Sequence, residues 1–100
     1  MESDIETRGD MRWSHRYLRL YPHQLLILAS ANAAIPRHII TFSGTAVAEE
    51  GSNSVVVHSN SRLGGSKQFT LRFKTDSLKD KWLWQLQRAL RRYNEVGPHS

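Results

Sequence analysis

The hydrophobic period of the chain changes in its last quarter, and this change constrains the fold more than any other feature. Between residues 77 and 93, apolar side chains recur every three or four positions, which is typical of one amphipathic helix about 25 Å long. Ser77, followed by Asp80 three residues later, resembles a capping box at the start of this helix. One helix with one apolar stripe needs a partner surface, so the preceding residues must bury it.

The preceding residues have the pattern of short β-strands separated by turn signals. The clearest segment alternates Phe69, Leu71 and Phe73 with polar residues, which is typical of a strand with one buried face. Seven short antiparallel strands and a terminal helix predict a β-rich (α+β) chain, with the helix on one end or open corner of a bent sheet or barrel. Strands are predicted near residues 4–8, 12–20, 24–30, 37–42, 45–50, 54–59 and 68–75, with a flexible loop at 59–67.

Length and composition are those of one small folded domain. One hundred residues leave no room for a second core, and 39% apolar residues are enough to form one. The absence of Cys excludes disulfides, Cys-based zinc sites and a thiol nucleophile. The longest apolar run, residues 25–29, is too short to span a bilayer, and no signal segment is recognised. We expect a domain over residues 1–94 and a disordered tail over residues 95–100.

The positive charge lies mainly in the second half of the chain. Residues 1–50 hold five Arg and six acidic residues, whereas residues 51–92 hold nine Lys and Arg and only two acidic residues. This asymmetry favours an anionic partner on a face built mainly by the second half. The alternative is an ordinary solvated surface that keeps a small domain soluble.

Four short motifs are spread over nearly the whole chain. They are residues 13–20 (WSHRYLRL), residues 40–47 (ITFSGTAV), residues 69–71 (FTL), and Trp82 with the apolar positions after it. In this order they resemble the pleckstrin homology (PH) family: its second strand, an Ile-Pro-Leu-x-x-x-x-Val stretch, one of its last strands, and the nearly invariant Trp of its closing helix. The resemblance implies a PH-like, seven-stranded bent antiparallel sandwich or barrel capped by one C-terminal α-helix. Another small β-barrel with a helix is the alternative.

The resemblance also implies a place for an anionic lipid headgroup. The family's phosphoinositide pocket uses a basic residue at the end of the first strand, then Lys or Arg, one residue, and Arg on the second strand. Arg16 matches the last of these positions, but Ser14 stands where a basic residue is expected. Arg8 or Arg12 could supply the first-strand charge. Because several phosphates need more donors than this set offers, we expect weak or non-specific binding to an anionic membrane.

The predicted helix has a second face that is not part of the apolar stripe. Trp84 lies 200° from Trp82 at 100° per residue, so only Trp82 can be buried, and we expect it to plug the barrel end. An exposed Trp near Arg residues is typical of an interface anchor for a protein partner. The alternative is a local cation–π contact between Trp84 and Arg88. The candidate protein-binding residues are Lys81, Trp84, Arg88 and Arg91.

Signals for enzymatic chemistry are lacking in the sequence. The five His residues have no short metal-ligand spacing, and no nucleophile elbow or phosphate-cradling Gly loop occurs, so we expect no catalytic residue, metal or cofactor. Nucleic-acid binding is suggested only by the sequence pI of about 10.1, without a recognition helix or stacking aromatics. The favoured hypothesis is a cytoplasmic, non-catalytic signalling module that docks a larger protein onto a phosphoinositide-containing membrane. The alternative is a protein-binding module beside an exchange-factor, GTPase-activating or scaffold domain.

Overall fold

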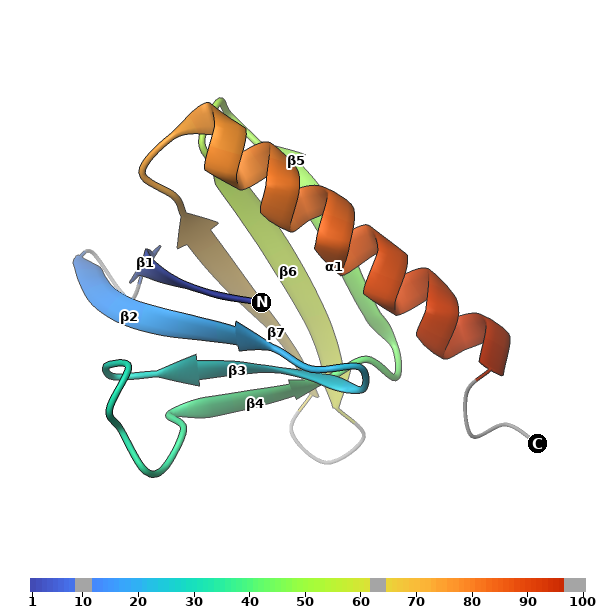
Figure 1. The fold of residues 1–100 in the computed structure, drawn as a ribbon. Helices are drawn as coiled ribbons and strands as arrows, with labels where there is room; N and C mark the ends of the chain where they lie inside the picture. Colours follow the sequence, from blue (N-terminus) through green and yellow to red (C-terminus); the bar gives the residue numbers. More distant parts are fainter. Residues whose placement is uncertain (9–11, 62–64, 97–100) are drawn as a thin grey trace.

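The computed structural model describes residues 1–8, 12–61 and 65–96, and within them seven strands precede one helix (Figure 1). The predicted order of elements is therefore confirmed. The elements are β1 (Glu2–Arg8), β2 (Trp13–Leu20), β3 (Gln24–Leu28), β4 (His38–Thr41), β5 (Thr45–Glu50), β6 (Ser54–Ser61), β7 (Gly65–Arg72) and α1 (Asp76–Val96).

All seven strands form one antiparallel sheet, in the order β4-β3-β2-β1-β7-β6-β5. Strand β1 pairs with β2 from Glu2 to Arg8, but with β7 only at two positions, Glu6 with Arg72 and Thr7 with Leu71. Because β1 and β7 are joined over so short a length, the sheet can bend there into two layers, β1–β4 and β5–β7 (Figure 1). The structure confirms the bent antiparallel sheet that the PH-like resemblance predicted.

The core lies between the two layers and the inner face of α1. Leu18 of β2, Leu71 of β7 and Trp82 of α1 have no exposed surface. The Trp82 ring stacks on Phe73, with ring centroids 6.0 Å apart and an interplanar angle of 24°. The apolar stripe of the helix therefore closes one side of the bent sheet, as Figure 1 shows for α1 along β5 and β6.

The start of α1 differs from the predicted capping box. The N-cap is Thr75, whose Oγ1 accepts a hydrogen bond from the Leu78 backbone N–H at 3.1 Å. The first helical hydrogen bond joins Lys79 N–H to the Thr75 carbonyl at 3.0 Å. Ser77 is already inside the helix, so its pairing with Asp80 is not a capping box. The sequence reading missed Thr75 because it required an acidic residue three positions later.

A buried ammonium group ties the first turn of α1 to the edge strand β5. Lys79 Nζ lies 3.1 Å from Glu49 Oε2 and 2.8 Å from Asp80 Oδ1, although the Lys79 side chain is only 5% exposed. Hydrogen bonds to Asp80 and then to Glu49 raise the pKa of Lys79 above its ordinary value. The helix is thus held at its N-terminal end by a charged contact as well as by its apolar stripe.

Several element boundaries differ from the predictions. Strands β6 and β7 pair as far as Ser61 with Gly65, so most of the predicted loop 59–67 belongs to a hairpin. The helix runs to Val96 instead of residue 93, two residues past the predicted domain boundary. The rest of the predicted tail, residues 97–100, lies outside the described residues. Gly44, in the turn between β4 and β5, has a φ of 70°, a left-handed conformation that glycine adopts without strain.

Candidate functional site

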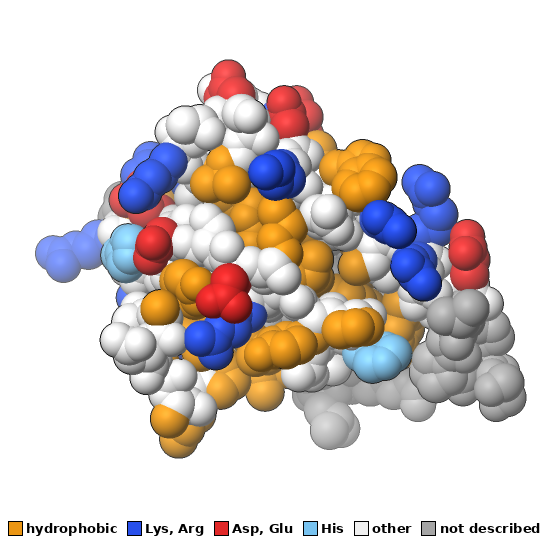
Figure 2. Space-filling view, viewed as in Figure 1, with side chains coloured by type: hydrophobic (Ala, Val, Ile, Leu, Met, Phe, Trp, Pro, Cys, Tyr) orange, Lys and Arg blue, Asp and Glu red, His pale blue; other side chains and the backbone are white. Residues whose placement is uncertain are grey.

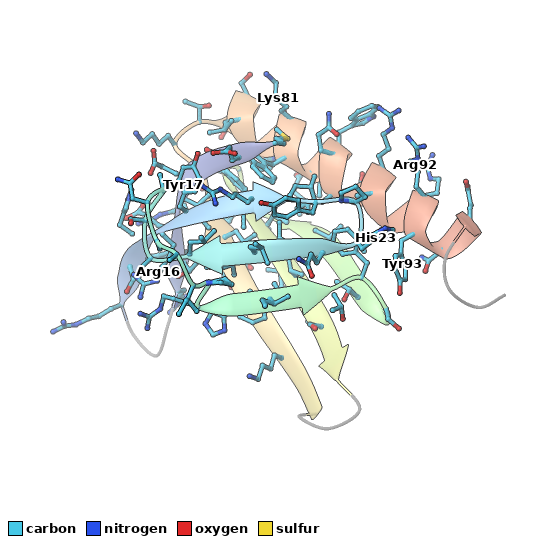
Figure 3. All side chains as sticks on the ribbon, turned by 60° about the horizontal axis from the view of Figure 1, so that its bottom comes forward. Arg16, Tyr17, His23, Lys81, Arg92 and Tyr93 are labelled. Atoms are coloured by element: carbon cyan, nitrogen blue, oxygen red, sulfur yellow. The ribbon has the colours of Figure 1, made fainter. Side chains whose placement is uncertain are left out.

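One end of the sheet is formed where three strands end and three others begin. Antiparallel pairing places the ends of β1, β3 and β6 beside the starts of β2, β4 and β7, which lie from the left side to the bottom of Figure 1. The helix covers the opposite side, where Tyr93 contacts His23 at the turn between β2 and β3 (Figure 3). We call the end of the sheet formed by these strand ends, opposite to the helix, the open end.

Three cations, Arg16, Arg37 and Lys67, act electrostatically on His38 at the open end, and we call these four residues the basic cluster. His38 of β4 packs edge-on against Phe69 of β7, with ring centroids 5.0 Å apart. This contact removes water from the imidazole and lowers the pKa of His38, and the charges of Lys67, Arg37 and Arg16 lower it further. Because each of these cations disfavours protonation of His38, the open end is a site of positive potential.

The strand register sets the directions of the predicted lipid-binding residues. Arg16 is the cross-strand partner of buried Ile5, so its half-buried side chain lies on the inner face of the sheet, and Figure 3 shows it at the open end. Ser14, opposite Thr7, lies on the same face and closer to the rim. Arg8 instead pairs with Trp13, on the outer face.

The remaining lipid-binding prediction, Arg12, is exposed and directly precedes β2. The structure thus brings Arg12, Ser14 and Arg16 to one end of β2, and it directs Arg8 to the other side of the sheet.

Three members of the basic cluster were missed by sequence reasoning, and two of them have a recognisable signal. Lys67 continues the alternation of Phe69 and Leu71 by one period, and so faces inward on β7. His38 in the same way precedes buried Ile40 by two residues. Arg37 directly precedes β4 and gives no such signal. Only the fold shows that these positions approach Arg16.

Two arginines elsewhere on the sheet are paired with acidic side chains. On the outer face, Arg72 Nη2 lies 2.8 Å from Glu6 Oε1, and Arg19 Nε lies 3.7 Å from Glu2 Oε1. Arg16, by contrast, donates through Nη1 to the His15 carbonyl at 2.7 Å. In the described part of the chain, the ion pairs involve none of Arg16, Arg37 or Lys67. The cations of the open end can therefore attract an external anion.

The outer face of α1 carries the predicted protein-binding residues together. Trp84 is 57% exposed, and the Arg88 guanidinium carbon lies 5.3 Å from the centroid of its ring. Trp84 is thus exposed and also makes the local cation–π contact with Arg88 that was the alternative expectation. Lys81 and Arg91 are exposed on the same helix, and Figure 2 shows blue side chains beside an orange one along this face.

The described residues form neither a metal cluster nor a membrane-spanning helix. Within ranges 1–8, 12–61 and 65–96, no three His, Asp or Glu side chains are grouped closely enough to hold a metal ion. The helix of the described chain is not long and apolar enough to cross a membrane.

The fold has many counterparts among solved structures. No family model matches this sequence, and no curated protein matches it either. The Slm1-PH domain superposes with a TM-score of 0.77 at 16% identity, over 90% of this chain and 96% of that chain, and its structures include complexes with inositol-4-phosphate and with phosphoserine. The PH domain of human oxysterol binding protein-related protein 11 gives a TM-score of 0.81 at 17% identity, over 100% of this chain and 88% of that chain.

A third counterpart is part of a larger assembly. The DH/PH domains of PDZ-RhoGEF, in complex with activated RhoA, give a TM-score of 0.81 at 15% identity, and the match covers 92% of this chain but 29% of that chain. The TM-scores of 0.77–0.81 establish a shared fold, and identities of 15–17% carry the comparison no further than the fold.

Proposed function

We propose that this chain, which has the pleckstrin homology fold, is a non-catalytic docking module whose open end binds anionic, phosphoinositide-containing membrane surfaces. The observation that carries the proposal is the basic cluster: Arg16 and Lys67 face inward at the open end, Arg37 precedes β4 there, and the ion pairs of the described chain use none of the three. A Lys or Arg near an anionic leaflet contributes about 1 kcal/mol, so three of them give useful but modest affinity. The complexes of Slm1-PH with inositol-4-phosphate support the same class of ligand for this chain.

We expect the binding to follow total negative charge more than the position of a phosphate. Ser14 replaces a basic residue of the family pattern, and Arg8 is directed to the outer face, so few donors remain for a multiply phosphorylated headgroup. Raising the salt concentration to about 0.15 M shortens the Debye length to about 8 Å and should weaken the binding strongly. A preference for one phosphoinositide isomer that persists at this salt would contradict the weak, charge-driven mode.

Two triple variants of equal charge test the proposal by vesicle co-sedimentation. The first replaces Arg16, Arg37 and Lys67 by Gln, and the matched control replaces three cations of the helix face. At about 1 kcal/mol for each cation, the open-end variant should bind phosphatidylserine vesicles about two orders of magnitude more weakly. The helix variant should stay within several-fold of wild type. Equal losses in both variants would show that net charge acts without a defined site. The control is Lys81→Gln, Arg88→Gln and Arg91→Gln.

The exposed Trp84 favours a second function, docking of a protein partner on the outer face of α1. A Trp that becomes buried at the centre of an interface commonly contributes 2 kcal/mol or more, which is roughly thirtyfold in affinity. For a protein partner that binds the outer face of α1, Trp84→Ala should lower the affinity of the partner by this factor and leave vesicle binding unchanged. Arg16→Ala should do the reverse. Equal effects of both changes on both activities would replace the two surfaces by a single one.

A further inference from the structure

The loop between β3 and β4 exposes apolar side chains beside the basic cluster. Ile35 is 80% exposed, which is the largest exposure of any large apolar residue in the described chain, and Ile39 at the start of β4 is 57% exposed. Residues 29–36 contain no charged side chain. Scattered exposed apolar residues are ordinary, but an uncharged run that ends in an exposed Ile and Pro36 is a local apolar tip. Figure 2 shows orange side chains at this tip, in the lower left.

The apolar tip is held in place by hydrogen bonds at its base and along its length. Arg37 N–H donates to the Ile27 carbonyl at 2.7 Å, which closes the base of the loop. Ala33 N–H donates to the Ser30 carbonyl at 3.2 Å, and Arg19 Nη2 donates to the Ala31 carbonyl at 2.9 Å. A loop that is already ordered loses little conformational entropy when it binds. The exposure of Ile35 is thus a feature of an ordered loop.

Charge next to the tip determines which partner it suits. Arg37 follows Ile35 by two residues and belongs to the basic cluster, together with Arg16 and Lys67. An apolar side chain flanked by cations matches the boundary between anionic headgroups and acyl chains, where each part finds its preferred environment.

We propose that Ile35 inserts into the acyl boundary of an anionic bilayer while the basic cluster contacts the headgroups. This inference rests on the proposed membrane docking and adds to it a depth, an inserted residue and an orientation. The open end faces the membrane, and α1 with Trp84 remains in water. Binding has two components, a charged one that salt screens and an apolar one that salt does not weaken.

A single introduced thiol can report insertion because the chain contains no Cys. Ile35→Cys and, as the matched control, Trp84→Cys are each labelled with a nitrobenzoxadiazole fluorophore. The probe is phosphatidylcholine vesicles with and without phosphatidylserine, some containing spin-labelled acyl chains. The label at 35 should brighten, shift to the blue and be quenched by the spin-labelled lipid, only with anionic vesicles. The label at 84 should keep its emission in water.

An unlabelled variant measures the apolar component of the affinity. Ile35→Ala should lower vesicle partitioning about tenfold, since it removes most of an exposed aliphatic side chain that the bilayer would bury. At high salt, wild type should keep a residual affinity that Ile35→Ala lacks, with identical far-UV circular dichroism. An unchanged residual affinity in Ile35→Ala would overturn the inference.

The remaining outcomes separate this inference from the function beneath it. If wild type co-sediments with anionic vesicles but the label at 35 stays in water, insertion is wrong and the docking function stands. If wild type does not bind anionic vesicles, the proposed function fails and insertion fails with it. If the emission at 35 shifts with protein concentration in the absence of lipid, the tip binds a second copy of the chain, and the bilayer assignment is overturned.

Discussion

The two tryptophans of α1 offer a sharp test of how the helix stabilises the fold. Trp82 is fully buried against Phe73, whereas Trp84, two residues later, is 57% exposed. Burying about 200 Å² of indole at about 25 cal/mol per Å² contributes about 5 kcal/mol. In the described part of the chain, however, Trp82 Nε1 has no hydrogen-bond partner, and an unmet buried donor costs about 1–3 kcal/mol. The two terms give a net loss of about 3 kcal/mol for Trp82→Ala.

Urea unfolding followed by far-UV circular dichroism measures this loss without relying on the mutated fluorophore. In thermal unfolding, the same loss should lower the melting temperature of Trp82→Ala by about 12–24 °C, at about 4–8 °C for each kcal/mol in a domain of this size. Trp82→Phe keeps an aromatic ring and removes the unmet donor, so it should cost clearly less than Trp82→Ala. Trp84→Ala should change the free energy of unfolding by about 0.5 kcal/mol or less, as is usual for surface substitutions. Similar losses for Trp82→Ala and Trp84→Ala would refute the assignment of the two helix faces.

Four further changes test the site and its frame. By NMR titration, the pKa of His38 should lie below 6.5. Inositol hexakisphosphate bound at the basic cluster should raise this pKa, so its affinity should increase as the pH falls through this range. An unmoved titration midpoint at saturation would count against the basic cluster. Ser14→Arg should strengthen vesicle binding measured by co-sedimentation, because it restores the missing inner-face cation, and unchanged affinity would mean that position 14 lies outside the site. Lys79→Met should lower the urea midpoint of unfolding. Because the pKa of Lys79 is raised in the fold, the difference in urea midpoint between this variant and wild type should shrink above pH 10.5. A difference that does not depend on pH would point to packing alone. Thr75→Ala should cost about 0.5–2 kcal/mol in thermal unfolding through loss of the N-cap, whereas Ser77→Ala should cost less, and the reverse order would restore the capping box.

The sequence was sufficient to predict the elements, because their patterns are local. The 3.6-residue period around Trp82 and the two-residue period from Phe69 to Phe73 each report which face of one element is buried. The end of the β6–β7 hairpin was mistaken for a loop, since Ser and Gly near residues 59–67 weaken the alternation there. The pairing of Ser61 with Gly65 depends on a neighbouring strand, which a local pattern does not contain.

The candidate site could be predicted only where it lies within one strand. Arg16 followed from the alternation of β2, but its approach to His38 of β4 and Lys67 of β7 joins three strands that are distant in sequence. The direction of Arg8 depended on its register with Trp13, which places it on the outer face. Residues that meet through the bending of a sheet have no common spacing, so their approach becomes visible only in the folded chain.

The most direct test of membrane docking through the open end is to map which residues meet the lipid. Anionic bicelles are added to the isotopically labelled protein, and amide and side-chain NMR signals are followed at physiological salt. We predict that the signals of Arg16, Ile35, Arg37, His38 and Lys67 move or broaden first, while Trp84 Nε1–H and the backbone of α1 are unaffected. If Trp84 and Arg88 respond and the open end does not, the membrane-facing surface has been assigned to the wrong side of the molecule.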